Sequence, residues 1–362
     1  MRKKVRLAIV GVGNCASSLL QGLEYYQRHP LKEVSGLMHP EIDGYRVGDV
    51  QVVAAFDVDR RKVGHPLEQA VFAKPNCTTV FQRELPCYGV TVQMGPLLDG
   101  IARHMEDYPE DCAFRVADAR PVDVAETLRS TRTEVLVCYL PVGSEQAARA
   151  YAEACLEARV ALVNCVPVFI ASHPEFAAEF TRRGVPVVGD DIKSQFGATM
   201  LHRVLVRTLC DRGVRLDRTY QLNTGGNTDF MNMLEQSRLK TKKISKTESV
   251  QSQLDQRLPD DCIHIGPSDY VPWQKDNKVC FLRLEWRGFG DVPMHLEARL
   301  SVEDSPNSAG VVIDALRCAK VGLDRGMAGP LEAVSALTMK HPPRQMRDSE
   351  AREALERFLA GE

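Results

Sequence analysis

Residues 5–16, VRLAIVGVGNCA, place a glycine-rich turn directly after a β-rich apolar run. A helical pattern follows over residues 17–27, so the turn lies between a strand and a helix. In that context, glycines let the backbone approach a pyrophosphate, and the helix N-terminus stabilises its charge. The alternative is a tight turn without a ligand. We expect dinucleotide binding by the residues of this turn, Gly11, Gly13, Asn14 and Cys15.

A second expected strand, residues 51–56, ends in Asp57. An acid at that position can hold the ribose hydroxyls of the dinucleotide, which favours NAD over NADP. It lies further downstream than the usual ~20 residues, and an irregular insertion over residues 28–49 accounts for the extra length. Arg60, Arg61 and Lys62 follow closely and leave the cofactor preference open.

Strands and helices alternate along the first two hundred residues, which predicts a Rossmann-type α/β fold with a doubly wound parallel sheet. Further strands are expected over 134–140, 160–164 and 185–188, with helices over 122–130, 144–158 and 176–183. Beyond residue 200, a helix (201–212) and strands with alternating polarity (218–222, 280–286, 293–301) predict a mixed α+β sheet that interrupts the first domain. Helices are expected again over 308–321 and 348–360. We therefore assign residues 1–200 and 308–362 to a discontinuous NAD-binding domain, and residues 201–307 to a catalytic and tetramerisation domain.

Composition excludes several classes of protein. The 362 residues carry a net charge of −2, which gives no general attraction to nucleic acid, and 44% apolar residues suffice for a sizeable core. No apolar stretch approaches the ~20 residues of a membrane span. The basic start, MRKK, superficially suggests a signal peptide, but the apolar run ends in glycines and is better explained as a strand. Eleven scattered cysteines without a CxxC pattern favour a reducing, cytoplasmic setting.

The segment GDDIKSQFGAT (residues 189–199) follows a strand and opens the helix expected from residue 201. Ser194, Gly197 and Thr199 are small residues at a helix start, a natural phosphate site, although an ordinary helix cap has the same appearance. Asp190 and Asp191 beside Lys193 suggest a polarised, partly buried site.

Four lysines, Lys240, Lys242, Lys243 and Lys246, lie within seven residues. Such a run is often a solvated face. The functional alternative is a cationic pocket, in which a lysine stabilises an enolate or alkoxide, or moves a proton if desolvation lowers its pKa. The pattern alone does not decide between them.

Long stretches carry a family resemblance: GVGNCASSLLQGLEYY (11–26), VVAAFDVDRRKVG (52–64), YLPVGSE (139–145), PVFIAS (167–172), GDDIKSQFGAT (189–199), LNTGGNTDFMNML (222–234), KKISKT (242–247), HIGPSDY (264–270), GFGDVP (288–293) and VEDSPNSAG (302–310). Together they resemble myo-inositol-1-phosphate synthase in its compact actinobacterial form. The similarity extends from residue 5 to about residue 345.

The resemblance implies NAD-dependent, redox-neutral conversion of D-glucose 6-phosphate to 1L-myo-inositol 1-phosphate. Carbon 5 is oxidised, carbon 6 is enolised and attacks the aldehyde at carbon 1, and carbon 5 is reduced again. This chemistry needs a nicotinamide held in place, cations that stabilise successive oxyanions, and a site that anchors the phosphate. The resemblance also implies a homotetramer that assembles through the sheet of the second domain. A requirement for a mono- or divalent cation stays unknown.

The family motifs assign roles to particular residues. The catalytic set is Asp191, Lys242, Lys246, Lys278 and Lys340. Lys242 and Lys340 are expected at the oxygens of carbons 5 and 1, and Lys246 and Lys278 at the phosphate and the enolate. The substrate-binding set is Ser194, Gly197, Ala198, Thr199, Asn223 and Asn227. The cofactor set adds Pro141, Asp190 and Asp304 to the turn residues and Asp57.

Some positions depart from the actinobacterial form. Phe196 and Thr228 replace aliphatic residues, and Tyr270, Pro272 and Cys280 also differ. A specialised-pathway paralogue could apply the same chemistry to fructose 6-phosphate, with the carbon 2 ketone as electrophile and a five-membered cyclitol phosphate as product. Two further alternatives are a simple NAD-dependent sugar-phosphate dehydrogenase and a non-catalytic NAD sensor. Normally a small pocket change is weak evidence for new specificity, so the inositol product is preferred.

Overall fold

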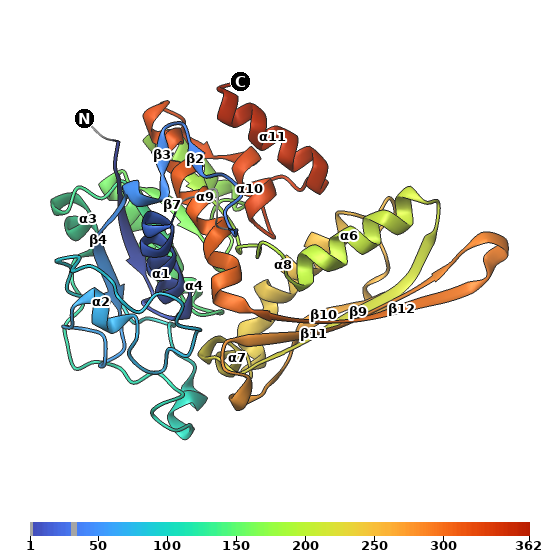
Figure 1. Cartoon of the computed structure of the whole chain (residues 1–362), viewed down its shortest axis with the longest axis horizontal. Coiled ribbons are helices and arrows are strands. Elements are labelled where there is room, and N and C mark those ends of the chain that lie inside the picture. The colour runs from blue at the N-terminus through green and yellow to red at the C-terminus, as the bar shows by residue number, and fades with distance from the viewer. Residues whose placement is uncertain (1–2, 30–34) are drawn as a thin grey trace.

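The computed structural model describes residues 3–29 and 35–362, so residues 30–34 of the expected insertion lie outside the described residues. A seven-stranded sheet has the order β13-β8-β7-β6-β1-β4-β5, and all of its pairs are parallel. Its strands are β1 (Val5–Val10), β4 (Val50–Asp57), β5 (Gln93–Met94), β6 (Val135–Cys138), β7 (Ala161–Asn164), β8 (Pro186–Val188) and β13 (Gly329–Pro330). The predicted α/β class with a doubly wound parallel sheet is confirmed (Figure 1).

Helices cover both faces of this sheet, which explains why most residues of its strands are apolar. Leu7 and Ile9 of β1 pack on one face with α1 (Asn14–Arg28) and α9 (Asp304–Asp324). Ala8 and Val10 belong to the core on the other face, with α3 (Val124–Ser130), α4 (Glu145–Ala158) and α5 (Pro174–Arg183). Alternate residues of one strand therefore enter two cores.

Strand β1 pairs with β4 on one side and with β6 on the other. The strand order thus reverses between β1 and β6, and a crevice opens there at the carboxyl ends of the strands. This is the place where open α/β sheets bind ligands, and the glycine turn follows β1 directly into it.

A second sheet has the order β10-β9-β11-β12 and forms an elongated arm (Figure 1). Its strands are β9 (Arg215–Gly225), β10 (Ile263–Tyr270), β11 (Asn277–Arg287) and β12 (Pro293–Glu303). Since β10 is parallel to β9 and the other pairs are antiparallel, the sheet contains both kinds of pairing. The helices α6 (Ala198–Asp211) and α8 (Lys240–Gln251) pack against it.

Two of the longer elements were not predicted. The sequence of β10, IHIGPSDY, contains Gly, Pro and Asp, which are depleted in strands. The sequence of α8, KTKKISKTESVQ, has no apolar stripe, so periodicity did not indicate a helix. Helix α9 also begins at Asp304, ahead of the expected residue 308.

The remaining elements are short or peripheral: α2 (Leu67–Ala70), β2 (Glu41–Ile42), β3 (Tyr45–Arg46), α7 (Thr228–Asn232), α10 (Glu332–Thr338) and α11 (Asp348–Ala360). The last of these is the predicted tail helix. Within the described part of the chain, no helix has the length and apolarity to cross a membrane.

Candidate active site

One cavity occupies the crevice and extends to the second sheet. Three helices begin at it: α1 at Asn14, α6 at Ala198 and α9 at Asp304. Each N-terminus carries unpaired N–H groups and the positive end of a helix dipole. Four lysine side chains line the same cavity, Lys242, Lys246, Lys278 and Lys340. The cavity is therefore suited to anionic ligands.

The glycine turn fits a dinucleotide. Gly11 has φ +84°, and a Cβ there would lie 2.7 Å from the carbonyl oxygen of Tyr139. A Cβ on Gly13 would meet nothing within 4 Å, because this residue faces the open cavity. Gly11 thus lets two strand ends approach one another, whereas Gly13 leaves room for a ligand close to the backbone.

Asp57 lies at the edge of the cavity and holds the turn in place. Its Oδ2 accepts the N–H of Val12 at 2.7 Å, and its Oδ1 accepts the N–H groups of Val58 (2.7 Å) and Asp59 (2.8 Å). Lys62 Nζ is 3.9 Å from Oδ2 and is fully buried.

The two arginines after Asp57 are engaged elsewhere. Arg60 pairs with Glu110 at 2.6 Å, and Arg61 pairs with Asp59 at 2.5 Å and with backbone carbonyls. Neither residue lines the cavity. The structure thus gives both arginines other partners, whereas Lys62 lies beside Asp57.

Asp191 is the centre of the cationic cluster. Its Oδ1 lies 3.1 Å from Lys242 Nζ and 3.0 Å from Lys340 Nζ, and its side chain is 1% exposed. Burial disfavours the charged form, but the two ammonium groups and a hydrogen bond from Ser245 hold the pKa of Asp191 well below its ordinary value. Asp191 is thus a permanent anion and not a proton acceptor at neutral pH.

The backbone at this position comes from two distant segments. The N–H of Asp190 donates to the carbonyl of His341, and the N–H of His341 donates back to Asp190. The N–H groups of Lys340 and Lys193 donate to Asp191 and Thr338. This pairing of residues 190–193 with 338–341 brings Lys340 to Asp191.

The lysines differ in their partners. Lys278 pairs with Asp304 at 2.5 Å. Among residues 3–29 and 35–362, no carboxylate lies within ion-pair distance of Lys246, and its side chain is largely buried. Burial and the neighbouring ammonium groups lower the pKa of Lys246 well below its ordinary value, and burial lowers the pKa of Lys340 to about 8. Both amines therefore lose their proton more readily than an exposed lysine does.

The predicted phosphate turn lies at the start of α6. Gly197 caps this helix, and Ser194, Gly197, Ala198 and Thr199 all line the cavity. Asn307 of α9 fixes the turn, since its amide donates to the carbonyl of Phe196 at 2.7 Å and accepts the N–H of Phe196 at 3.0 Å. Asn307 thus links the N-terminal ends of α6 and α9.

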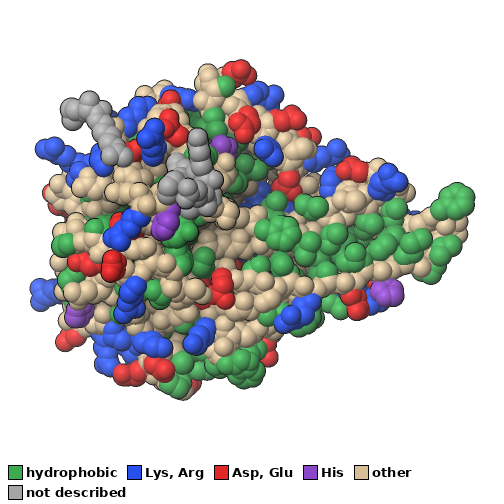
Figure 2. All heavy atoms as spheres, in the orientation of Figure 1, with side chains coloured by type: hydrophobic (Ala, Val, Ile, Leu, Met, Phe, Trp, Pro, Cys, Tyr) green, Lys and Arg blue, Asp and Glu red, His purple; other side chains and the backbone are tan. Residues whose placement is uncertain are grey.

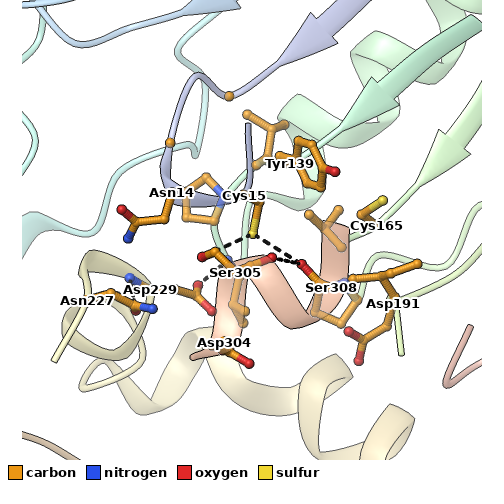
Figure 3. A pocket seen from close by; sticks show the side chains of 18 of the residues that line it. Asn14, Cys15, Tyr139, Cys165, Asp191, Asn227, Asp229, Asp304, Ser305 and Ser308 are labelled. Carbon is orange, nitrogen blue, oxygen red and sulfur yellow. Dashed lines mark hydrogen bonds between the residues drawn. The ribbon is translucent and has the colours of Figure 1, made fainter. Parts of the chain in front are cut away.

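The start of α9 meets the glycine turn and α7. Figure 3 shows the Cys15 thiol facing the hydroxyls of Ser305 and Ser308, at 3.8 and 3.9 Å. Asn227 lines the cavity and caps α7, and its amide donates to buried Asp276 at 2.9 Å. Burial and the nearby Asp304 raise the pKa of Asp276 to about 6.

Two predicted site residues lie outside the cavity. Asp190 is fully buried, and its carboxylate accepts from Asn164, Ser172 and the N–H groups of Ile170 and Ala171. The side chain of Asn223 is also buried and donates to the carbonyl of Gly266. Both are therefore internal residues that shape the loop after β8 and the pairing of β9 with β10.

The other predicted residues come together at the cavity. They are Gly11, Gly13, Asn14, Cys15, Asp57, Pro141, Asp191, Ser194, Gly197, Ala198, Thr199, Asn227, Lys242, Lys246, Lys278, Asp304 and Lys340. No group of three or more His, Cys, Asp or Glu side chains suited to a metal ion occurs in the described part of the chain.

The sequence reasoning missed several residues that belong to the site, among them Ser245, Ser305, Gln221 and Asp229. Ser245 had a usable signal. With Lys242, Lys246 and Ser249 it follows the i, i+3, i+4, i+7 spacing of one helix face. That signal required recognising α8 as a helix.

The fold and this cavity define a Rossmann-type α/β enzyme with a cationic active site. The family model for myo-inositol-1-phosphate synthase matches residues 197–305. The inositol-3-phosphate synthase of Mycolicibacterium smegmatis is 54% identical over 99% of this chain and 98% of its own length. The chain belongs to the myo-inositol-1-phosphate synthase family of intramolecular lyases.

Two solved structures resemble this fold. The crystal structure of Ari2 is 36% identical, with a TM-score of 0.77 over 99% of both chains. A myo-inositol-1-phosphate synthase-related protein from Thermotoga maritima is 24% identical, with a TM-score of 0.81 over 99% of this chain and 98% of its own, and shows the same fold.

Proposed function

We propose that this protein converts D-glucose 6-phosphate to 1L-myo-inositol 1-phosphate with NAD and without net redox change. One observation carries the proposal: Lys242 and Lys340 both contact Asp191 in the cavity that the glycine turn also lines. Cations at oxyanion positions beside a dinucleotide turn are what oxidation, enolisation and aldol closure need.

The residues expected to hold the dinucleotide are Gly11, Gly13, Asn14, Cys15, Asp57, Pro141 and Asp304. When bound, NAD would accept and return the hydride at carbon 5. The engagement of Arg60 and Arg61 by other partners supports NAD over NADP, because these two guanidinium groups are not free to pair with a 2′-phosphate.

The chain's own groups have separate tasks in this scheme. The start of α6, from Ser194 to Thr199, anchors the phosphate. Lys242 and Lys340 stabilise the oxygens of carbons 5 and 1, while Lys246 and Lys278 face the phosphate and the enolate. Asp191 keeps Lys242 protonated, because its charge outweighs the burial that would otherwise lower the pKa of that lysine.

The test is incubation of the purified protein with NAD and glucose 6-phosphate, followed by NMR of the dephosphorylated product. We expect myo-inositol with catalytic NAD. A parallel incubation with fructose 6-phosphate would give a five-membered cyclitol if the paralogue alternative holds. Stoichiometric accumulation of reduced cofactor would instead identify a simple dehydrogenase, and no product from either sugar would contradict the proposal.

We also propose a homotetramer that assembles through residues 201–307. Hydrophobic side chains gather over the arm of α6 and the second sheet (Figure 2). Val204 on α6 is 49% exposed and Met294 on β12 is 44% exposed, beside half-buried Leu296, Ala298 and Leu300. An exposed apolar surface of this kind is typical of a protein interface. Light scattering of the wild type and of Val204→Asp tests it; a wild-type monomer would refute it.

A further inference from the structure

Ser245 lies on the face of α8 that also carries Lys242 and Lys246. Its side chain is completely buried, and its hydroxyl donates to Asp191 Oδ2 at 2.6 Å. The negative charge of Asp191 does not require a serine there, since two ammonium groups already contact the same carboxylate.

The three donors contact the two oxygens of the Asp191 carboxylate unequally. Lys242 and Lys340 share Oδ1, whereas Ser245 is the hydrogen-bond donor described for Oδ2. The donors come from α8 and from the segment after α10. The backbone of Asp191 is also fixed, because it has φ +62°, donates to the carbonyl of Val166 and accepts from the N–H of Lys340. A non-glycine residue in this region needs such surroundings to hold it.

We propose that Ser245 is a positioning residue, which orients the Asp191 carboxylate so that one oxygen is shared by Lys242 and Lys340. The inference rests on the proposed function, in which these two lysines stabilise the reacting oxygens. The terminal torsion of an aspartate is soft and roughly two-fold, so packing alone defines its carboxylate plane poorly. The hydroxyl supplies the missing constraint.

The serine also limits how strongly Asp191 attracts the lysines. A hydroxyl that donates to a carboxylate stabilises part of its charge. Without it, Lys242 and Lys340 are the remaining donors, and Lys340 should hold its proton to higher pH. The other titratable groups that act on Asp191 or Lys340 are Lys246 from α8, Lys278 from β11, Asp304 from α9, Cys165, Lys193 and His341.

The test compares Ser245→Ala with Ser249→Ala. Ser249 is a completely buried serine one turn further along α8, where its hydroxyl and carbonyl bond to Arg203 and not to Asp191. For Ser245→Ala we expect kcat to fall on the order of 10- to 100-fold with KM nearly unchanged. The Ser249→Ala control should keep the wild-type rate.

A second measurement does not depend on turnover. Competitive acetylation of the lysines across a pH series, followed by mass spectrometry, reports the titration of Lys340 in each variant. We expect the Lys340 titration to move to higher pH in Ser245→Ala and to stay in place in Ser249→Ala. Ser245→Cys, which keeps the size but has a weak donor, should behave like Ser245→Ala and covers the case in which alanine prevents folding.

Equal rates and equal Lys340 titrations in Ser245→Ala and Ser249→Ala would overturn the positioning role. If the wild type forms no cyclitol phosphate, the proposed function fails, but the acetylation comparison still decides whether Ser245 controls the Asp191 cluster.

Discussion

Lys278 on β11 and Asp304 at the start of α9 form an ion pair, with Nζ 2.5 Å from Oδ1, at the junction of the two sheets. Burial would raise the pKa of Asp304, but Lys278 outweighs it and holds that pKa below its ordinary value. Asp304 also lies at the N-terminus of a 21-residue helix, where an acid is favoured. The pair therefore joins the second sheet to the Rossmann half within the active site.

Lys278→Ala should abolish turnover while leaving NAD bound. Loss of one group that stabilises a developing oxyanion costs about 10²–10³-fold in kcat, whereas the glycine turn and Asp57 are untouched. Steady-state kinetics and calorimetric titration with NAD check the two halves of this prediction. Full activity would rule out a catalytic role for Lys278, and lost NAD affinity would indicate a cofactor-binding role.

Lys242→Ala should lower kcat by a similar factor, and Lys243→Ala supplies the matched control. The two lysines are neighbours on α8, but Lys242 contacts Asp191 and Lys243 is exposed. Helix propensity and net charge change equally in both variants. Assays of both variants with glucose 6-phosphate should therefore separate the effect of the contact with Asp191 from the effect of losing one positive charge. Equal losses of activity would mean that only the overall positive charge of this region matters.

Gly11→Ala and Gly13→Ala should fail in different ways. The alanine at position 11 would have a positive φ and a Cβ 2.7 Å from the carbonyl oxygen of Tyr139, so we expect a lower melting temperature and weak NAD binding. The alanine at position 13 has open space, so the fold should stay intact while NAD affinity drops. Thermal unfolding and calorimetry with NAD distinguish the two; unchanged NAD affinity in Gly13→Ala would place the ligand elsewhere.

The sequence predicted the first half of the fold well because its signals are local. The glycine turn, the apolar strands and the acid at the end of the second strand all lie within short windows of sequence. Each of these patterns follows from a local physical requirement. The lysines 242, 246, 278 and 340 are separated by up to about a hundred residues. Only family motifs, not spacing, could bring them to one site.

Adjacent acids show where the sequence was insufficient. The sequence alone does not distinguish Asp190 from Asp191, but the side chains of consecutive residues point in different directions. The carboxylate of Asp190 is taken up by backbone amides of residues 170–172, while that of Asp191 meets the lysines. Likewise, Asp276 acts through contacts across the fold, which no local pattern reports. The helix-face spacing of Ser245 indicates a role only once α8 is recognised as a helix.

Stability should rise with pH through a buried lysine outside the cavity. Lys193 is 2% exposed and donates to the carbonyl of Ala336, and burial lowers its pKa to about 7, against about 10.4 in an unfolded chain. Between these values the unfolded state binds more protons, so the free energy of unfolding increases with pH, by at most about 1.4 kcal/mol per pH unit from this group.

Urea unfolding of the wild type and of Lys193→Met at pH 7, 8 and 9 measures this contribution. We expect a steeper rise for the wild type than for the variant. Parallel dependences in the two proteins would mean that Lys193 keeps its proton in the folded state.

The backbone pairing of residues 190–193 with 338–341 has a consequence for biosynthesis. The Rossmann strands up to β8 are complete when fewer than two hundred residues have been made, and domains generally fold from the N-terminus as the ribosome delivers them. Lys340 reaches Asp191 only through a segment that follows β8 by about 150 residues. A nascent or truncated chain that ends before this segment can contain the glycine turn, but it lacks one of the two ammonium groups at Asp191, so the cationic cluster is completed only after residue 340 has been made.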